Sequence, residues 1–247
     1  LHDFNGMADS LEKLETERKA TMATIAHELR TPMTVLQGRL AALRDGVFEV
    51  TPAEISILLQ QTEMLTRLAE DLRVLSLVEV GKMSLELTEV NITQLVSDVA
   101  RGFEPQAKSK NVKLNVCLPY MLTLLVDSTR LRQIVANLLD NAIKFTPEGG
   151  SVHLGLTQRE QEITLIVRDT GPGVSEESLA RMFNRFYQGD ARIMGGSGLG
   201  LSVVKSLIDL HGGRISVLNH AEGGAVFCVF LPRGVQTKTD SPMALAT

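Results

Sequence analysis

The 247-residue chain has little of three things, each of which would define a class of protein. It has two cysteines, Cys117 and Cys228, whose positions suit neither a disulfide framework nor a metal site, so we expect reduced thiols in a cytosolic-type compartment. It has no uninterrupted apolar run near the roughly 20 residues that cross a bilayer. It has no basic excess, because a net charge of -4 and a pI of about 5.8 argue against a broad cationic surface for nucleic acid.

The apolar residues that are present indicate two helices in the first third of the chain. The hydrophobic content of 44% and charged content of 22% are typical of a soluble globular chain of one or two domains. Apolar residues recur every three or four positions from Met22 to Leu43, and this helix should end near Arg44–Gly46. Thr51–Glu54 supplies an N-cap hydroxyl, a first-turn proline and a carboxylate, and the helix that it opens should reach about Val80.

A hairpin of these two helices could not bury both of its apolar stripes alone. The spacing therefore predicts a dimeric four-helix bundle, with a monomeric hairpin docked on the rest of the chain as the alternative. His27 lies between Ile25 and Leu29, so the same periodicity turns it outward, next to Glu28 and one turn before Thr31. This grouping suggests a nucleophile, and a solvated surface histidine is the plainer interpretation. Pro32 is expected to kink the helix just after His27.

Beyond a linker that begins at Gly81–Lys82, the pattern changes to alternating strands and helices. Mostly antiparallel strands with helices gathered between them predict an α+β two-layer sandwich, and the polar tail from Gly234 should be disordered. The expected strands are Leu85–Val90, Val112–Leu118, Leu122–Val126, Ser151–Gln158, Glu162–Asp169, Arg214–Asn219 and Ala225–Leu231. The expected helices are Ile92–Ala107, Ser128–Lys144, Ser175–Met182 and Leu199–His211.

Two clusters in this part combine polar side chains in a way that suits a nucleotide. Asn137 and Asn141 are one turn apart on one helix face, with Lys144 nearby, which suits Mg²⁺ together with phosphate. Two solvated asparagines would give the same pattern. Asp169–Gly173 closes the most apolar strand, and its carboxylate could accept a hydrogen bond from an exocyclic amine such as that of adenine. An ordinary strand-ending turn is the alternative.

Two further clusters suit phosphate. Arg185 lies between Phe183 and Phe186, and a loop to Gly195 follows, which we interpret as a lid with an arginine able to reach phosphate. Gly195–Leu201 precedes a helix, whose N-terminal N–H groups can bind phosphate. It is neither a Walker A loop nor a G-x-G-x-x-G fingerprint.

In order and spacing, these motifs resemble those of the sensor histidine kinases of two-component systems, over roughly residues 15–232. Ala26–Pro32 resembles the H-box of that family, and Phe4–Ala8 resembles the exit helix of a HAMP module. Gln37–Leu40 and Asp45–Phe48 are most similar to envelope-stress and efflux-regulating sensors of the BaeS/AdeS type. The N, G1, F and G2 boxes would be Asn137–Phe145, Asp169–Gly173, Phe183–Phe186 and Gly196–Leu201.

The resemblance implies a dimerisation and phosphoacceptor hairpin joined to an ATP-binding domain of the Bergerat type, an α+β two-layer sandwich. The domains would be 1–15, the end of a HAMP module or connecting coiled coil; 16–82, the hairpin; 83–233, the catalytic domain; and 234–247, the tail. The fragment would be cytoplasmic, and the full-length protein, with its sensor upstream of Leu1, would lie in the inner membrane.

The resemblance also assigns roles to residues and partners. His27 would attack the γ-phosphate of ATP, Glu28 would take or hold its proton, and the phosphoryl group would pass to an aspartate of a response regulator. Thr31 occupies the position that aligns water for dephosphorylating the regulator. Asn137 and Asn141 would hold Mg²⁺. The ATP contacts would come from Asn137, Asn141, Lys144, Phe145, Asp169, Gly171, Gly173, Arg185, Gly196, Gly198, Leu199 and Gly200.

Three positions depart from the family pattern without removing a required part. Ala26 replaces a frequent serine, Gly224–Val226 lacks a threonine that could contact phosphate, and the lid from Gln188 to Gly195 is short. Two other classes remain open. One is a dimeric nucleotide-binding scaffold that relays a signal without turnover, and the other is an ATPase or chaperone without phosphotransfer.

Overall fold

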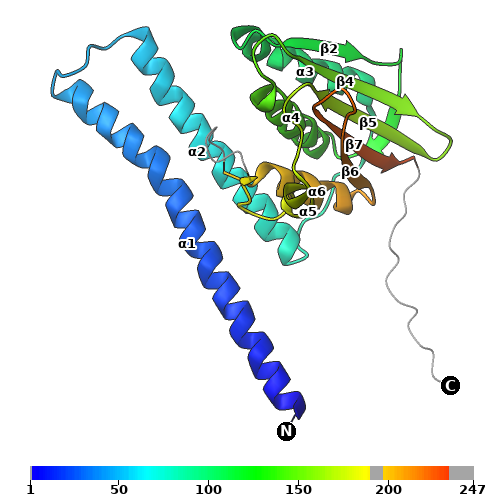
Figure 1. The fold of residues 1–247 in the computed structure, drawn as a ribbon, viewed down its shortest axis with the longest axis horizontal. Coiled ribbons are helices and arrows are strands. Elements are labelled where there is room, and N and C mark those ends of the chain that lie inside the picture. Colours follow the sequence, from blue (N-terminus) through cyan, green and yellow to red (C-terminus); the bar gives the residue numbers. More distant parts are fainter. Residues whose placement is uncertain (1, 190–196, 234–247) are drawn as a thin grey trace. The chain divides into compact units, whose positions relative to one another are not determined.

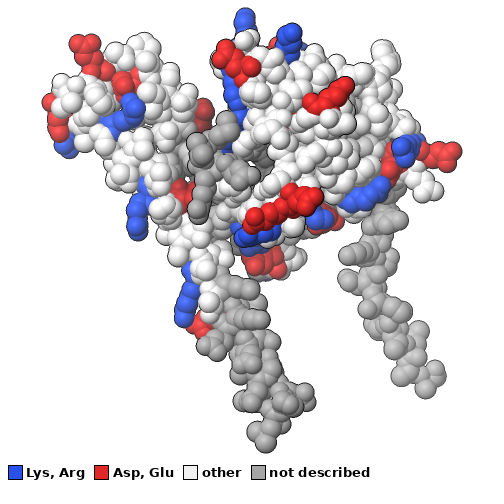
Figure 2. All heavy atoms as spheres, in the orientation of Figure 1, with Lys and Arg blue, Asp and Glu red and all other residues white. Residues whose placement is uncertain are grey.

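The computed structural model describes residues 2–189 and 197–233, and for residues 2–14, 17 and 18 it describes only the backbone. The chain divides into two compact units, Leu1–Val74 and Leu75–Thr247. In the orientation of Figure 2, described side chains of both signs are interspersed over the face in view, in keeping with the small net charge. None of the described helices combines the length and apolarity that a membrane crossing needs.

The first unit is a helical hairpin, drawn in blue and cyan in Figure 1. Helix α1 spans His2–Arg44, and α2 spans Pro52–Glu79 and continues into the second unit. Thr51 Oγ1 accepts a hydrogen bond from Glu54 N at 3.2 Å, which is the expected N-cap of α2. Arg39 Nη1 lies 2.6 Å from Glu54 Oε2, and this ion pair ties the end of α1 to the start of α2.

Helix α1 continues unbroken on both sides of Pro32. Because proline has no N–H, Pro32 cannot donate the usual helical hydrogen bond to the carbonyl of Glu28. The kink expected after His27 remains a prediction. Several large apolar side chains of the hairpin are exposed in the single chain, including Met22 at 58%, Leu40 at 49% and Leu59 at 57%. Such a surface is what a helical partner would cover.

The second unit has two layers. The larger sheet has the strand order β2-β4-β5-β7-β6, in which β2 and β4 are parallel and the other neighbours are antiparallel. A separate antiparallel pair joins β1 to β3. The strands are β1 Thr88–Asn91, β2 Lys113–Cys117, β3 Thr123–Val126, β4 Ser151–Gln158, β5 Glu162–Asp169, β6 Arg214–Asn219 and β7 Ala225–Pro232. The helices are α3 Ile92–Ser109, α4 Ser128–Phe145, α5 Glu176–Arg181 and α6 Gly200–Leu210.

Helices α3, α4 and α6 cover one face of the sheet, which confirms the predicted two-layer architecture (Figure 1). The core lies between the layers, where Leu139 and Ile143 of α4, Val167 of β5 and Val229 of β7 are each 0% exposed. Strand β7 alternates buried and half-buried residues along its length, as a sheet with one covered face requires.

The first expected strand, Leu85–Val90, is shorter than predicted and begins at Thr88. The reason lies in the segment before it. Glu86 N donates a hydrogen bond to Asp127 Oδ2 at 3.1 Å, so this backbone binds a helix cap instead of a strand. Asp127 Oδ1 also accepts from Arg130 N at 3.0 Å, which caps α4.

His211, at the C-terminal end of α6, also forms a hydrogen bond with Asp127. Its Nδ1 lies 2.7 Å from Leu207 O, which can only accept, so Nδ1 carries the proton. Nε2 is then the acceptor, and Asp127 N donates to it at 3.2 Å. Burial lowers the pKa of His211, while its hydrogen bond to Leu207 and the Asp127 carboxylate oppose that shift.

The neutral form of His211 therefore contributes to stability. Because the folded-state pKa is lowered, the contribution is complete above the ordinary value of 6.5 and is lost as the pH falls through the folded pKa. Replacing His211 by Gln should remove this part of the pH dependence, which we expect to be about 1 kcal/mol for one buried hydrogen bond. Urea unfolding between pH 8 and pH 5 measures it, with His153→Gln on the exposed part of β4 as control. Parallel pH profiles for the wild type and His211→Gln would contradict it.

Candidate functional site

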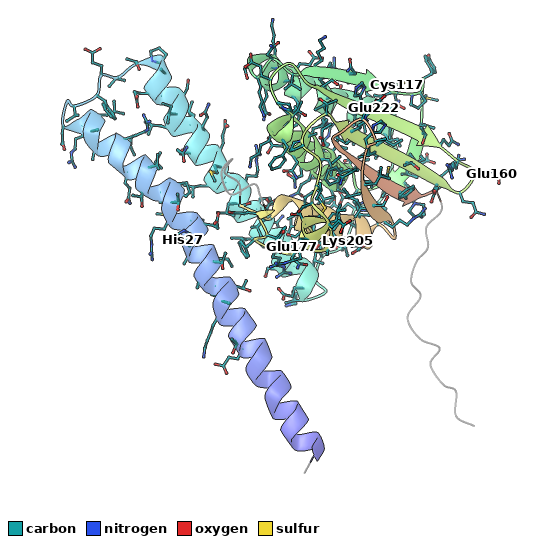
Figure 3. All side chains as sticks on the ribbon, in the orientation of Figure 1. His27, Cys117, Glu160, Glu177, Lys205 and Glu222 are labelled. Atoms are coloured by element: carbon teal, nitrogen blue, oxygen red, sulfur yellow. The ribbon has the colours of Figure 1, made fainter. Side chains whose placement is uncertain are left out.

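His27 lies on the exposed surface of α1, as its position in the apolar pattern predicted. Figure 3 shows its side chain projecting out from the helix. Thr31 Oγ1 donates to His27 O at 3.3 Å, so the hydroxyl one turn on lies beside the backbone of the histidine. Glu28 is half-buried next to it. An imidazole in this position is accessible to a reacting partner, which a core histidine would not be.

Helix α4 separates an apolar face from a polar one. Its buried residues are Leu131, Ile134, Val135, Leu138, Leu139, Ala142 and Ile143. Asn137, Asn141 and Lys144 occupy the opposite face and are half-buried. Asn137 Nδ2 donates to Gly200 O at 3.3 Å, so this polar face meets the first residue of α6. The structure thus brings two of the sequence clusters together.

Asp169, the last residue of β5, is a buried carboxylate with an exposure of 4%. Its Oδ1 accepts hydrogen bonds from Gly171 N at 2.8 Å and Ala225 N at 3.1 Å. Burial raises the pKa of Asp169, and the backbone N–H groups of Gly171, Ala225 and Asp169 itself partly offset that shift. Both of these hydrogen bonds use Oδ1, which leaves Oδ2 to accept a hydrogen bond from a ligand.

The turn after Asp169 is in close contact with the end of α4 and with β6. A Cβ added at Gly171 would lie 2.8 Å from Phe145 O, so only glycine fits there. Asn219 Nδ2 donates to Val174 O at 2.7 Å, and Val174 N donates back to Asn219 Oδ1 at 2.8 Å. A Cβ at Gly173, which has a φ of +79°, would lie 2.8 Å from the same Asn219 oxygen. The turn is therefore fixed from two sides.

The glycine-rich cluster leads into α6 through a close backbone contact. Phe186 N donates to Gly198 O at 3.0 Å, and Gly198, with a φ of +67°, would place a Cβ 2.7 Å from the Phe186 carbonyl carbon. Leu199 is the N-cap residue and is 0% exposed, so any ligand contact there would be made by backbone. An apolar N-cap side chain cannot accept hydrogen bonds from the first N–H groups of α6. Those N–H groups therefore suit the binding of an anion. Gly196 lies outside the described residues.

Two basic residues differ in their surroundings. Lys144 is half-buried, and its ammonium lies 5.5 Å from the centre of the Phe145 ring. Burial lowers the pKa of Lys144, Asp140 raises it, and Lys110 lowers it further. Arg185, also within the second unit, forms a 3.0 Å ion pair with Glu79. Its contact with phosphate remains a prediction.

The donor set suits Mg²⁺ only in the company of phosphate. No group of three or more metal-ligating His, Cys, Asp or Glu residues occurs in the described part of the chain. The Asn137 amide nitrogen binds Gly200, so its Oδ1 can face away from that contact, and Asn141 offers a second neutral oxygen. Two neutral oxygens fit a cation that keeps waters and takes its anionic ligands from a triphosphate.

Four residues shape this site through contacts that we did not predict from the sequence. They are Gly224, which lies against the Asp169 carbonyl, and Asn219, Thr170 and Lys110, which bind backbone near the turn or the end of α4. Asn219 ends a strand, and an asparagine at a strand end is a general signal for a turn contact. The other three depend on partners distant in the sequence.

A helical hairpin with an exposed histidine, joined to a sheet whose helical layer presents asparagines, a buried aspartate and a glycine-rich helix start, defines a histidine-kinase core. Two family matches agree with this. Residues 17–81 match the His Kinase A (phospho-acceptor) domain, and residues 126–235 match the histidine kinase-, DNA gyrase B- and HSP90-like ATPase family.

Individual histidine kinases are similar to this chain over most of its length. The signal transduction histidine-protein kinase BaeS of Escherichia coli is 37% identical over 233 residues, which are 93% of this chain and 50% of BaeS. The structure of the histidine kinase AdeS of Acinetobacter baumannii superposes with a TM-score of 0.70 at 32% identity, over 85% of this chain and 98% of that one. The histidine kinase ThkA in complex with the response regulator TrrA gives 0.66 at 28% identity, over 90% of this chain and 64% of that one.

The chain belongs to the sensor histidine kinase family. This confirms the resemblance seen in the sequence, including its BaeS/AdeS character. The chain spans about half the length of BaeS. The ATP-binding fold is confirmed with it, whereas the roles of individual site residues and the domain boundaries remain predictions.

Gly224 offers a sharp test of the site geometry, because its neighbour is a matched control. Gly223 and Gly224 have φ values of +94° and +87°, and a Cβ at Gly223 would meet nothing within 4 Å. A Cβ at Gly224 would lie 1.9 Å from Asp169 O. We expect Gly223→Ala to cost about 1–2 kcal/mol for its backbone conformation, and Gly224→Ala to cost about 1–3 kcal/mol more for the clash.

Urea unfolding of the two variants gives these values directly. Equal losses of stability in Gly223→Ala and Gly224→Ala would show that the backbone at Asp169 is not packed as described.

Proposed function

We propose that this chain is the catalytic core of a sensor histidine kinase that transfers the γ-phosphoryl group of ATP to His27 and from there to an aspartate of a response regulator. The observation that carries the proposal is the pairing of an exposed histidine on a phosphoacceptor-type hairpin with a nucleotide-type face on α4, against the start of α6. A surface histidine without the second feature would not support it.

The first reaction is an in-line displacement at phosphorus. A nitrogen of the His27 imidazole forms a bond to the γ-phosphorus, the bond to the β,γ-bridging oxygen breaks, and ADP leaves with that electron pair. The imidazole proton passes to the Glu28 carboxylate, which raises the nucleophilicity of the ring. When the phosphoryl group passes from His27 to a carboxylate of the regulator, the bond from nitrogen to phosphorus breaks, and return of the proton from the Glu28 carboxyl group restores the neutral histidine.

The residues of the second unit would bind the nucleotide. The exocyclic amine of adenine would donate to Asp169, whose Oδ1 already accepts two backbone hydrogen bonds. Phe145, Gly171 and Gly173 would lie beside the base, in a turn whose close packing against Phe145 O and Asn219 Oδ1 requires glycine at both positions. The start of α6, with Gly198, Leu199 and Gly200, would bind phosphate through backbone N–H groups.

Lys144, Arg185 and Gly196 complete the proposed phosphate contacts, and Asn137 and Asn141 would hold Mg²⁺. The cation would neutralise charge on the phosphate oxygens. Burial and Lys110 lower the pKa of the half-buried Lys144 ammonium by more than Asp140 raises it. A triphosphate beside it would supply the missing negative charge.

We further propose that the hairpin forms a homodimer and that the full-length protein is anchored in a membrane. The exposed apolar residues of the hairpin and its match to the phosphoacceptor domain support the first. The resemblance of Phe4–Ala8 to a HAMP exit helix supports the second. A partner of receiver type accords with the solved complex of ThkA with its regulator TrrA.

Labelling with γ-³²P-ATP and Mg²⁺ tests the kinase. We expect the wild type to incorporate label that survives alkali and is lost in acid, as a phosphohistidine requires, and His27→Gln to incorporate none. Binding of nucleotide without labelling would favour the dimeric scaffold that relays a signal without turnover. Release of free phosphate without a labelled protein would favour an ATPase or chaperone.

Thr31 is the residue to test for phosphatase activity toward the regulator. Thr31→Ala should leave autophosphorylation within about twofold of the wild type and slow regulator dephosphorylation about 10-fold or more, which is the effect of removing a group that orients the attacking water. Thr34→Ala is the matched control, because Thr34 Oγ1 makes the same kind of bond, to Arg30 O at 2.9 Å. Equal dephosphorylation rates for the two variants would exclude a role for Thr31.

A further inference from the structure

The C-terminal end of α4 lacks one of its own hydrogen-bond donors. In a helix, the carbonyl of Ile143 would accept from the residue four positions later, which is Pro147 and has no N–H. Thr146 N donates to Ala142 O at 3.0 Å and does not serve Ile143. Ile143 is 0% exposed, so bulk water does not reach this residue either. A buried carbonyl without a donor would cost stability.

Lys110 supplies the donor. It is the C-cap residue of α3, and its Nζ donates to Ile143 O at 3.0 Å and also to Lys144 O. An ammonium group at this place is favourable for a second reason, because the C-terminal end of a helix carries partial negative charge. Lys110 is half-buried, in contrast to the exposed Lys108 two residues earlier.

The residues after Lys110 also bind the segment that follows α4. Asn111 has a φ of +55°, and its carbonyl accepts a hydrogen bond from Gly149 N at 2.9 Å. Lys113 N donates to Gly150 O at 2.9 Å as β2 begins. The turn between α3 and β2 therefore holds the whole exit of α4, from Ile143 to Gly150.

The exit of α4 in turn contacts the turn that carries Asp169. Phe145 O lies where a Gly171 side chain would be, and a Cβ at Gly150 would lie 2.7 Å from Thr170 Oγ1. Thr170 Oγ1 also accepts from Ser151 N at 2.9 Å. Because Gly171 N donates to Asp169 Oδ1, a shift of the α4 exit would reach the carboxylate through one backbone hydrogen bond.

We propose that Lys110 is a positioning residue of the nucleotide site. Its ammonium group fixes the last carbonyls of α4, and so fixes both the turn of helix that presents Lys144 and the backbone against which Gly171 and Asp169 pack. The proposal rests on the nucleotide-binding role of that site. It assigns Lys110 no contact with the nucleotide, because the hydrogen bonds of its ammonium group go to the two carbonyls.

The electrostatics of the site agree with this placement. Lys110 is one of the groups that lower the pKa of Lys144, and the Asp140 carboxylate opposes it. Removing the charge at residue 110 should therefore raise the pKa of Lys144, while a guanidinium at that position should keep it low.

The test compares Lys110→Met, which removes the donors and keeps the aliphatic stem, with Lys110→Arg, which keeps charge and donors, and with the control Lys108→Met. Amide hydrogen exchange is measured on the nucleotide-free chain, and affinity is measured with Mg²⁺ and the fluorescent analogue TNP-ATP. In Lys110→Met we expect amide exchange at Gly171 to accelerate relative to that of the core amides of β5. We also expect TNP-ATP to bind about 10-fold more weakly, which is the size of effect that the loss of charged hydrogen bonds gives. Lys110→Arg should show the exchange rate at Gly171 and the TNP-ATP affinity of the wild type, and so should Lys108→Met.

Exchange at Gly171 decides the outcome. The proposal is overturned if Gly171 in Lys110→Met exchanges as it does in Lys108→Met, or if Gly171 and the β5 core accelerate equally, which is a general loss of stability. If Lys110→Met does not fold, Lys110→Gln, which keeps a shorter uncharged donor, takes its place. A wild type that binds no TNP-ATP would refute the proposed function, while the exchange result would still decide whether Lys110 positions Gly171.

Discussion

The second unit depends on one helix that must satisfy two opposite demands. One face of α4 buries Ile134, Leu139 and Ile143 completely against the sheet and the neighbouring helices. The other face keeps Asn137, Asn141 and Lys144 accessible. The burial fixes the rotation of the helix, because turning it by one residue would place an asparagine amide in the core at a cost of several kcal/mol. The energy that folds the domain therefore also aims its polar groups at the start of α6.

The sequence predicts this arrangement well where the determining contacts are local. The bounds of β4 follow from alternation and those of β5 from an apolar run, each with flanking turns, and the structure has both as expected. The Thr51–Glu54 cap follows from its hydroxyl, proline and carboxylate, and the exposed position of His27 follows from helical periodicity. The start of β1 was misplaced because Glu86 N binds Asp127, which is 41 residues away in the sequence. No local pattern contains that contact.

The same limit applies to the site. Asp169 and Gly171 are recognisable because a carboxylate and glycines follow an apolar strand. That Gly224 must be glycine depends on a carbonyl 55 residues earlier in the chain, and the role of Lys110 depends on the missing N–H of Pro147. Leu199 shows a related difficulty, because its place in the glycine-rich motif does not reveal that its side chain belongs to the core.

Two charged groups of the site are held in surroundings that oppose their charge. Burial raises the pKa of Asp169 and lowers that of Lys144, so each group is less stable in its ionised form than in water. Neither shift helps the fold, since an apolar residue at either position would avoid the cost of burying a charge. A nucleotide would relieve both, because its exocyclic amine donates to a carboxylate and its phosphates attract an ammonium group. Part of the free energy of binding would then come from the cost of burying these two charges, and this would account for a buried Asp169 and a half-buried Lys144.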